Sequence, residues 1–167
     1  ISVINQKGGV GKTTTVINLA AGLTTKGKKI LVIDLDPQGN ATTGLGLSNN
    51  DNSDRTIYSV LNGTRKVSEV ITKTNIENLD LITSNVDLSG LEVETAGDTR
   101  RAFILKEQIT SYLNDSRGSY DYVLIDCPPS LSLLTIMALV ASNSLVVPLQ
   151  TEFFALEGLT QLMKTIE

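Results

Sequence analysis

The stretch NQKGGVGKTTT, residues 5–15, lies between a short aliphatic strand candidate at 1–5 and a series of apolar residues with helical spacing. Apolar residues recur at i, i+3, i+4 and i+7 across 16–23, and Gly27 ends the pattern. A glycine-rich turn between a strand and a helix lets backbone N–H groups surround phosphate oxygens, because glycine has no Cβ to block the approach. The sequence therefore predicts a phosphate-binding loop at its first strand-to-helix junction.

The residues of this loop have distinct predicted tasks. Lys12 is expected to reach the β and γ phosphates of a nucleotide, and the Thr13 hydroxyl to ligate Mg²⁺. The positive end of the following helix adds to the attraction for phosphate. One feature departs from the standard loop: Gln6 stands where its first glycine would be, and the additional Lys7 follows. The predicted nucleotide-contacting set is Lys7, Gly8, Gly9, Val10, Gly11, Lys12, Thr13 and Thr14.

Strand and helix candidates alternate along the rest of the chain, with a polar surface loop expected at 48–54. This alternation predicts an α/β fold with a mainly parallel, twisted sheet and helices on both faces. The further strand candidates are 30–33, 79–82, 122–126 and 145–149, and the further helix candidates are 57–61, 67–71, 101–113 and 133–141.

The length of 167 residues favours one domain over 1–167, since domains average roughly 150 residues. The first residues already read as a buried strand, and apolar residues with helical spacing continue to Glu167 without a stop signal. We therefore expect a domain cropped at both ends from a longer protein.

Composition limits the possible functions. The formal net charge of −4 gives no global electrostatic reason to bind nucleic acid or an anionic membrane, and Lys28–Lys29 and Arg100–Arg101 are interpreted as solvated faces. One cysteine, Cys127, and no histidine exclude an intrachain disulfide and leave little material for a zinc or iron–sulfur site. No apolar run reaches the ~18 residues that a membrane span needs. These properties favour a reducing cytoplasm.

Three aspartates follow or end predicted strands, and ligands of open α/β sheets bind beyond the carboxyl ends of the strands. Asp126 ends a strand of four apolar residues, the Walker B arrangement in which a carboxylate holds Mg²⁺ through a water molecule. Asp34 ends another strand and is expected to support the metal site, indirectly, or the loop lysine. Asp36 follows in a segment with Pro and Gly that could move. Cys127 is interpreted as a small buried thiol, because no histidine could activate it.

The motifs KGGVGKTTT at 7–15 and DLDPQGNAT at 34–42 resemble the deviant Walker A loop and the switch I motif of the ParA/MinD superfamily of P-loop ATPases. The resemblance implies a P-loop NTPase fold with ATP and Mg²⁺ as cofactors. It implies that Lys7 acts in trans, contacting the phosphates bound by the other subunit of an ATP sandwich dimer, and that Asp36 positions the attacking water. The implied catalytic residues are Lys7, Lys12 and Asp36.

The motifs DPQGNAT and DCPPSLSLLTIMAL, at 36–42 and 126–139, are more similar to the chromosome- and plasmid-partitioning branch, of ParA/Soj type. That branch implies an ATP-dependent homodimer that binds DNA without sequence preference. It also implies a ParB-type centromere-binding partner that stimulates a weak ATPase, and a cytoplasmic, nucleoid-associated location. The stretch VVPLQTEFFALEGL, at 146–159, resembles the segment that borders the nucleotide base in this branch.

Two alternatives stay open at this stage. A MinD-like cell-division ATPase would share the loop and act at the membrane through a C-terminal amphipathic helix. A nucleotide-dependent binding module would also have this loop; its dimer would recruit a partner, and hydrolysis would be incidental. A nitrogenase-iron-protein interpretation needs two cluster cysteines per subunit, and this chain has one.

Overall fold

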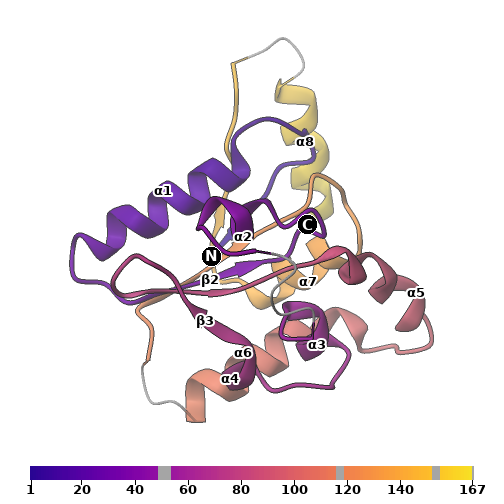
Figure 1. Ribbon diagram of the computed structural model, residues 1–167. Coiled ribbons are helices and arrows are strands. Elements are labelled where there is room, and N and C mark those ends of the chain that lie inside the picture. The colour runs from indigo at the N-terminus through magenta and orange to yellow at the C-terminus, as the bar shows by residue number, and fades with distance from the viewer. Residues whose placement is uncertain (49–53, 116–118, 152–154, 167) are drawn as a thin grey trace.

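The computed structural model describes residues 1–48, 54–115, 119–151 and 155–166. A twisted sheet with strand order β3-β4-β2-β5-β1-β6 forms its centre (Figure 1). All neighbouring strands are parallel except β3, which pairs antiparallel with β4 at one edge. The strands are β1 (Ser2–Val3), β2 (Ile30–Asp34), β3 (Ile71–Lys73), β4 (Leu79–Ile82), β5 (Tyr122–Asp126) and β6 (Leu145–Val146).

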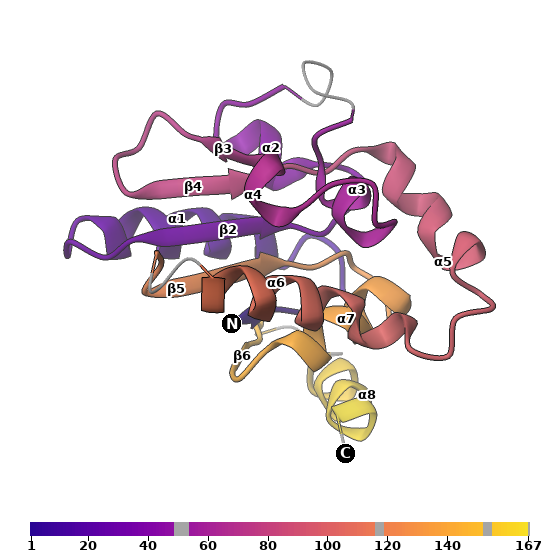
Figure 2. The same cartoon turned by 90° about the horizontal axis from the view of Figure 1, so that it is seen from below.

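Helices cover both faces of the sheet, as the sequence predicted. Figure 1 shows α1 on one side of the strands and α6 and α7 on the other, and Figure 2 shows the α6 and α7 side from below. The helices are α1 (Lys12–Thr24), α2 (Asn40–Gly44), α3 (Ile57–Leu61), α4 (Val67–Val70), α5 (Leu91–Glu94), α6 (Ile104–Asp115), α7 (Leu133–Ala141) and α8 (Ala155–Ile166), with 3-10 turns η1 (Val86–Gly90) and η2 (Arg101–Phe103).

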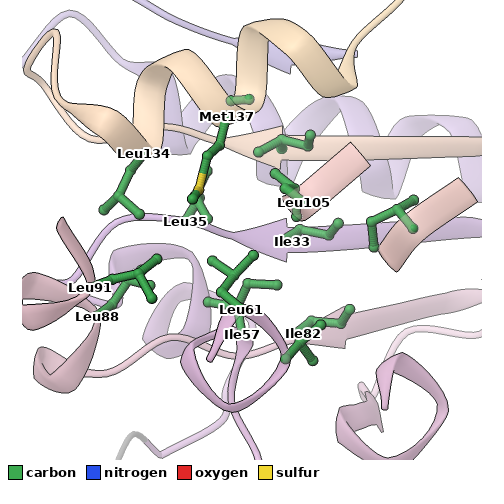
Figure 3. Packing of buried hydrophobic residues seen from close by; sticks show 14 of the residues in the cluster. Ile33, Leu35, Ile57, Leu61, Ile82, Leu88, Leu91, Leu105, Leu134 and Met137 are labelled. Carbon is green, nitrogen blue, oxygen red and sulfur yellow. The ribbon is translucent and has the colours of Figure 1, made fainter. Parts of the chain in front are cut away.

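The two hydrophobic cores follow from the alternation of side chains along β2, whose five residues are all buried. Ile30 and Val32 face α1, where they pack with Val16. Leu31 and Ile33 face α3, α6 and α7 in the larger cluster, part of which Figure 3 shows around Ile33. A continuous aliphatic run is what a parallel strand covered on both faces requires. Strand β2 is thereby fixed in the sheet, and with it the position of the segment that follows.

The structure differs from the predicted elements at the sheet edges. Residues 67–71 were expected to be helical, but α4 ends at Val70 and Ile71 begins β3. A strand of three residues is too short to produce a periodic signal. The strand expected at 145–149 ends at Val146, and Pro148, which has no N–H to donate, follows soon after. The loop expected at 48–54 lies mostly outside the described residues.

No helix in the described ranges is long and apolar enough to cross a membrane.

Cys127 is 1% exposed, and burial raises the pKa of its thiol to about 12. The prediction of a small buried thiol is thereby confirmed.

A hydrogen bond to a mostly buried carboxylate links the segment before β5 to β4. The Tyr120 hydroxyl donates to Asp80 Oδ2 at 2.7 Å, and the Asp80 side chain is 14% exposed. Tyr120→Phe is expected to lower the free energy of unfolding by about 1 kcal/mol, because Asp80 loses a partly buried donor. Tyr122→Phe is the matched control, since Tyr122 is 39% exposed. Urea unfolding of both variants measures the difference, and equal stabilities would contradict the assigned role of the bond.

Candidate functional site

The glycine-rich loop joins β1 to α1 at the edge where the parallel strands end. Gly11 precedes the first residue of α1 with φ +87°, a left-handed conformation that side chains disfavour. Thr15 then fixes the first helical turn, since its backbone N and its hydroxyl both donate to the Gly11 carbonyl, at 2.8 and 2.7 Å. The sequence thus folds into the strand, loop and helix that phosphate binding requires.

A cavity of about 330 Å³ opens above this loop. Most of the predicted nucleotide-contacting residues line it, together with Asp36 from the segment after β2. Val10 is buried and lies outside the lining, while Lys7 is exposed and also lies outside it among the described residues. The lining residues are Gly8, Gly9, Gly11, Lys12, Thr13, Thr14, Asp36, Asn40 and Pro129.

Lys12 is held inside the loop and is only 7% exposed. Its Nζ donates to the Lys7 carbonyl at 3.1 Å, which curls the loop around the ammonium group. Burial lowers the pKa of Lys12, and the nearby carboxylates of Asp126 and Asp36 oppose that shift. Lys12 thus contributes a positive charge to the lining of the cavity, which favours the binding of an anion there.

Asp126 and Thr13 form the second part of the site. The Thr13 hydroxyl donates to Asp126 Oδ2 at 2.7 Å, while Asp126 Oδ1 is buried and has no hydrogen-bond partner in the described ranges. Burial is the main reason that the pKa of Asp126 rises to about 7. A buried carboxylate oxygen beside a threonine hydroxyl suits a hard cation such as Mg²⁺, which prefers oxygen ligands.

The described residues contain no group of three or more His, Cys, Asp and Glu side chains that could hold a metal by themselves. Mg²⁺ is commonly bound by one or two protein ligands together with phosphates and water. Thr13 and Asp126 therefore fit a Mg²⁺ ion that enters with a nucleotide.

Asp34 pairs in register with Asp126 across β2 and β5, yet its carboxylate points to a different set of partners. Asp34 Oδ2 accepts hydrogen bonds from the backbone N and the hydroxyl of Thr42, at 2.8 and 2.7 Å, and Asp34 Oδ1 accepts from Asp36 N at 3.2 Å. Burial raises the pKa of Asp34 to about 6, against the effect of the Thr42 bonds. The structure therefore does not bring Asp34 into the lining of the cavity.

Asp36 lies at the cavity wall and is 6% exposed. Its Oδ1 accepts from Gln38 N at 3.0 Å, and its carbonyl accepts from Gly39 N at 2.9 Å, which forms the turn that leads into α2. Asp36 thus lines the same cavity as the residues of the glycine-rich loop.

Several residues that position the site were missed from the sequence. Asn5 is 8% exposed; its Oδ1 accepts from Lys7 N at 2.9 Å and its Nδ2 donates to the Pro148 carbonyl at 2.8 Å. Gln150 Nε2 also donates to the Gly9 carbonyl, at 3.3 Å. An asparagine two residues before a turn residue is a recognisable signal for the first of these bonds. The contacts with Pro148 and Gln150 span more than 140 residues and left no local signal.

P-loop NTPases are defined by a glycine-rich phosphate-binding loop at the first strand-to-helix junction of a mainly parallel sheet. The structure has this loop between β1 and α1, and the chain is therefore of this class, as the sequence predicted. The whole chain, residues 1–167, matches the AAA_31 family, described as an AAA domain, and the chain belongs to this family.

Curated relatives confirm the predicted resemblance to ParA/Soj-type partitioning proteins. The chain is 50% identical over its full length to the chromosome partitioning protein ParA of Caulobacter vibrioides (strain NA1000 / CB15N), and covers 61% of that protein. It is 48% identical over 99% of its length to the sporulation initiation inhibitor protein Soj of Bacillus subtilis (strain 168), and covers 64% of it. The chain thus spans about three fifths of the length of these relatives.

Solved structures with the same fold include nucleotide complexes. Cobyrinic acid a,c-diamide synthase from Mycobacterium smegmatis, with a bound ATP analogue and magnesium, has a TM-score of 0.91 and 39% identity, and the match covers 99% of this chain and 65% of that one. A plasmid partition protein from Borrelia burgdorferi B31, bound to AMPPNP, has a TM-score of 0.81 and 30% identity, with coverages of 99% and 66%.

The raised pKa of Asp126 predicts a pH-dependent stability. Between the usual pKa of 3.8 and the folded value of about 7, the folded state binds the proton more tightly than the unfolded state. The ionised carboxylate therefore lowers stability above about pH 7, and this cost disappears below about pH 4. Without metal or nucleotide, Asp126→Asn is expected to unfold at higher denaturant concentration than the parent at about pH 8, with the gain shrinking towards pH 4.

Asp121→Asn is the control for this measurement. Asp121 is exposed, and its hydrogen bond from the Lys29 backbone N–H lowers its pKa, so its removal is expected to give no gain at high pH. Denaturant unfolding at several pH values compares the two variants. An Asp126→Asn gain that is independent of pH would contradict the assigned pKa.

Proposed function

We propose that the chain is the nucleotide-binding part of an ATP-dependent switch ATPase that acts in chromosome or plasmid partitioning. The observation that carries the proposal is the cavity over the loop, with Lys12, Thr13 and Asp36 in its lining. The match of nearly the whole of this chain to ParA and Soj, and the ATP analogue with magnesium in a structural relative, support it.

The proposed roles follow the geometry of the site. Lys12 and the backbone N–H groups of the glycine-rich loop bind the phosphates, and the Thr13 hydroxyl ligates Mg²⁺ while Asp126 holds it through a water molecule. Bound Mg²⁺ neutralises charge on the β and γ phosphate oxygens. Asp36 orients the water that attacks the γ phosphorus; the bond from that phosphorus to the oxygen bridging to the β phosphorus breaks, which gives ADP and phosphate.

Lys7 is proposed to act on the phosphates of a second copy. Two hydrogen bonds hold its backbone, from Lys7 N to Asn5 Oδ1 and from Lys12 Nζ to its carbonyl, whereas its side chain is exposed and lies outside the cavity lining. An exposed lysine at the rim of a phosphate loop is placed to add positive charge across a dimer interface, where charge gathers during phosphoryl transfer. ATP would in this way hold two copies together.

The consequences for the whole protein are part of the same proposal. The ATP-bound homodimer binds DNA without sequence preference on the nucleoid in the cytoplasm, and a ParB-type partner stimulates its weak hydrolysis. Loss of the γ phosphate then removes contacts that favour the dimer and resets the protein. The naming of the relatives as chromosome partitioning proteins supports this part.

The mass of the full-length protein in solution tests the proposal. With Mg²⁺ and ATP the parent is expected to be a dimer and with ADP a monomer, because only ATP offers the γ phosphate that Lys7 contacts. Lys7→Ala is expected to stay monomeric while it still binds ATP. Lys26→Ala, which removes an exposed lysine near the end of α1, is expected to behave as the parent.

Light scattering coupled to size exclusion measures the mass, and fluorescence of a labelled ATP confirms that nucleotide is bound. A Lys7→Ala variant that dimerises normally, or a parent that does not respond to ATP, would refute the proposed role of Lys7.

A further inference from the structure

The segment that carries Asp36 is hydrogen-bonded at both of its ends to one buried carboxylate. Asp34, 0% exposed, accepts from Asp36 N on one side and from Thr42 on the other, so the chain between them forms a closed loop. Two residues of this loop, Asp36 and Asn40, line the cavity. The place of Asp36 over the phosphate loop therefore depends on how firmly the loop is closed.

Thr42 closes the loop with its side chain as well as its backbone. Its hydroxyl donates to Asp34 Oδ2 at 2.7 Å and at the same time accepts from Ser84 N at 3.1 Å, and both Thr42 and Ser84 are 0% exposed. One hydroxyl thus connects the end of β2, helix α2 and the segment after β4. Hydrogen bonds to a buried charged group are among the stronger ones in proteins.

Close packing holds α2 against α1 at its other end. A Cβ added to Gly44 would lie 2.5 Å from Ile17 Cδ1, which shows how near α2 approaches α1. Helix α1 begins at Lys12, directly after the phosphate loop. Packing against α1 and the Thr42 hydrogen bonds to Asp34 and Ser84 therefore both hold α2 in place.

We infer that Thr42 is a positioning residue for hydrolysis, which acts through Asp34 to hold Asp36 in place over the phosphates. This inference rests on the proposed ATPase function and assigns a residue to it that does not line the cavity. Loss of the hydroxyl would leave Asp34 Oδ2 with the backbone donor of Thr42 alone and deprive Ser84 N of its acceptor. The loop that carries Asp36 would then move by a fraction of an ångström or more, while the phosphate-binding residues stay in place.

The test compares Thr42→Val, which keeps the shape and removes the hydroxyl, with Thr42→Ser, which keeps the hydroxyl, in the full-length protein. Thr42→Val is expected to lower kcat by about tenfold to a hundredfold with little change in KM or ATP affinity, because small misplacements reduce the rate without reducing binding. Thr42→Ser is expected to keep a kcat close to that of the parent. Asp36→Ala gives the rate expected when the carboxylate is missing altogether.

Thr43→Val is the matched control. Thr43 is the next residue of α2 and is exposed. Within the described part of the chain its hydroxyl donates only to carbonyls of its own helix turn, such as that of Gly39 at 3.1 Å. Its variant is expected to keep the kcat of the parent. A Thr42→Val variant with the kcat of the parent would overturn the inference. So would loss of ATP binding in both Thr42→Val and Thr42→Ala, since the role would then be in folding.

Hydrogen exchange separates this inference from the proposed function. Amides of residues 36–44 are expected to exchange faster in Thr42→Val than in Thr42→Ser or Thr43→Val, whether or not ATP is present, while those of β5 stay protected. A parent that binds ATP without any turnover would refute the proposed ATPase and the catalytic part of this inference together, and exchange would still decide whether Thr42 anchors the loop. Equal exchange in all variants would refute the anchor.

Discussion

The hydrogen bond from Thr13 to Asp126 joins the two halves of this molecule's site. Thr13 lies in the first turn of α1 and Asp126 at the end of β5, so the 2.7 Å contact fixes the phosphate loop onto the sheet. The register of β5 with β1 and β2 in turn places Val3, Asp126 and Asp34 at the same edge. This edge of the sheet positions the loop, the oxygens of Thr13 and Asp126 that are proposed to hold Mg²⁺, and the segment with Asp36.

Burying acidic groups so close together costs stability, and the two carboxylates differ in how far hydrogen bonds offset that cost. Asp34 is fully hydrogen-bonded within the chain, through Thr42 and the backbone of Asp36, and serves to hold a loop. Asp126 keeps one buried oxygen without a partner among the described residues, and the pKa of its carboxyl is raised to about 7. Unpaired polar groups of this kind are costly, and they concentrate at functional sites. Of the two neighbouring carboxylates, Asp34 holds a loop through its hydrogen-bond donors, whereas the oxygen of Asp126 without a donor supports the proposed role in holding Mg²⁺.

The sequence was informative where one local pattern decides both structure and chemistry. Lys12, Thr13 and Asp126 could be predicted because each stands at a fixed place relative to the end of a strand. The role of Thr42 and the contact of Asn5 with Pro148 could not be predicted, since the partners Ser84 and Pro148 lie 42 and 143 residues away. The antiparallel edge strand β3 was missed because its three residues follow α4 without a turn. The sequence correctly predicted that Asp34 lies at the end of a strand, but only the structure shows that its carboxylate accepts hydrogen bonds from Thr42 of α2.

We propose that Thr13 and Asp126 hold a hydrated Mg²⁺ beside the phosphates of ATP. Calorimetric titration of ATP into the full-length protein, with and without Mg²⁺, tests it most directly when the parent is compared with Thr13→Ser and Thr13→Val. Mg²⁺ is expected to strengthen ATP binding about tenfold or more in the parent and in Thr13→Ser, whereas Thr13→Val, which lacks the ligating hydroxyl, is expected to lose this gain. An equal gain in Thr13→Val, or no effect of Mg²⁺ on the parent, would contradict it.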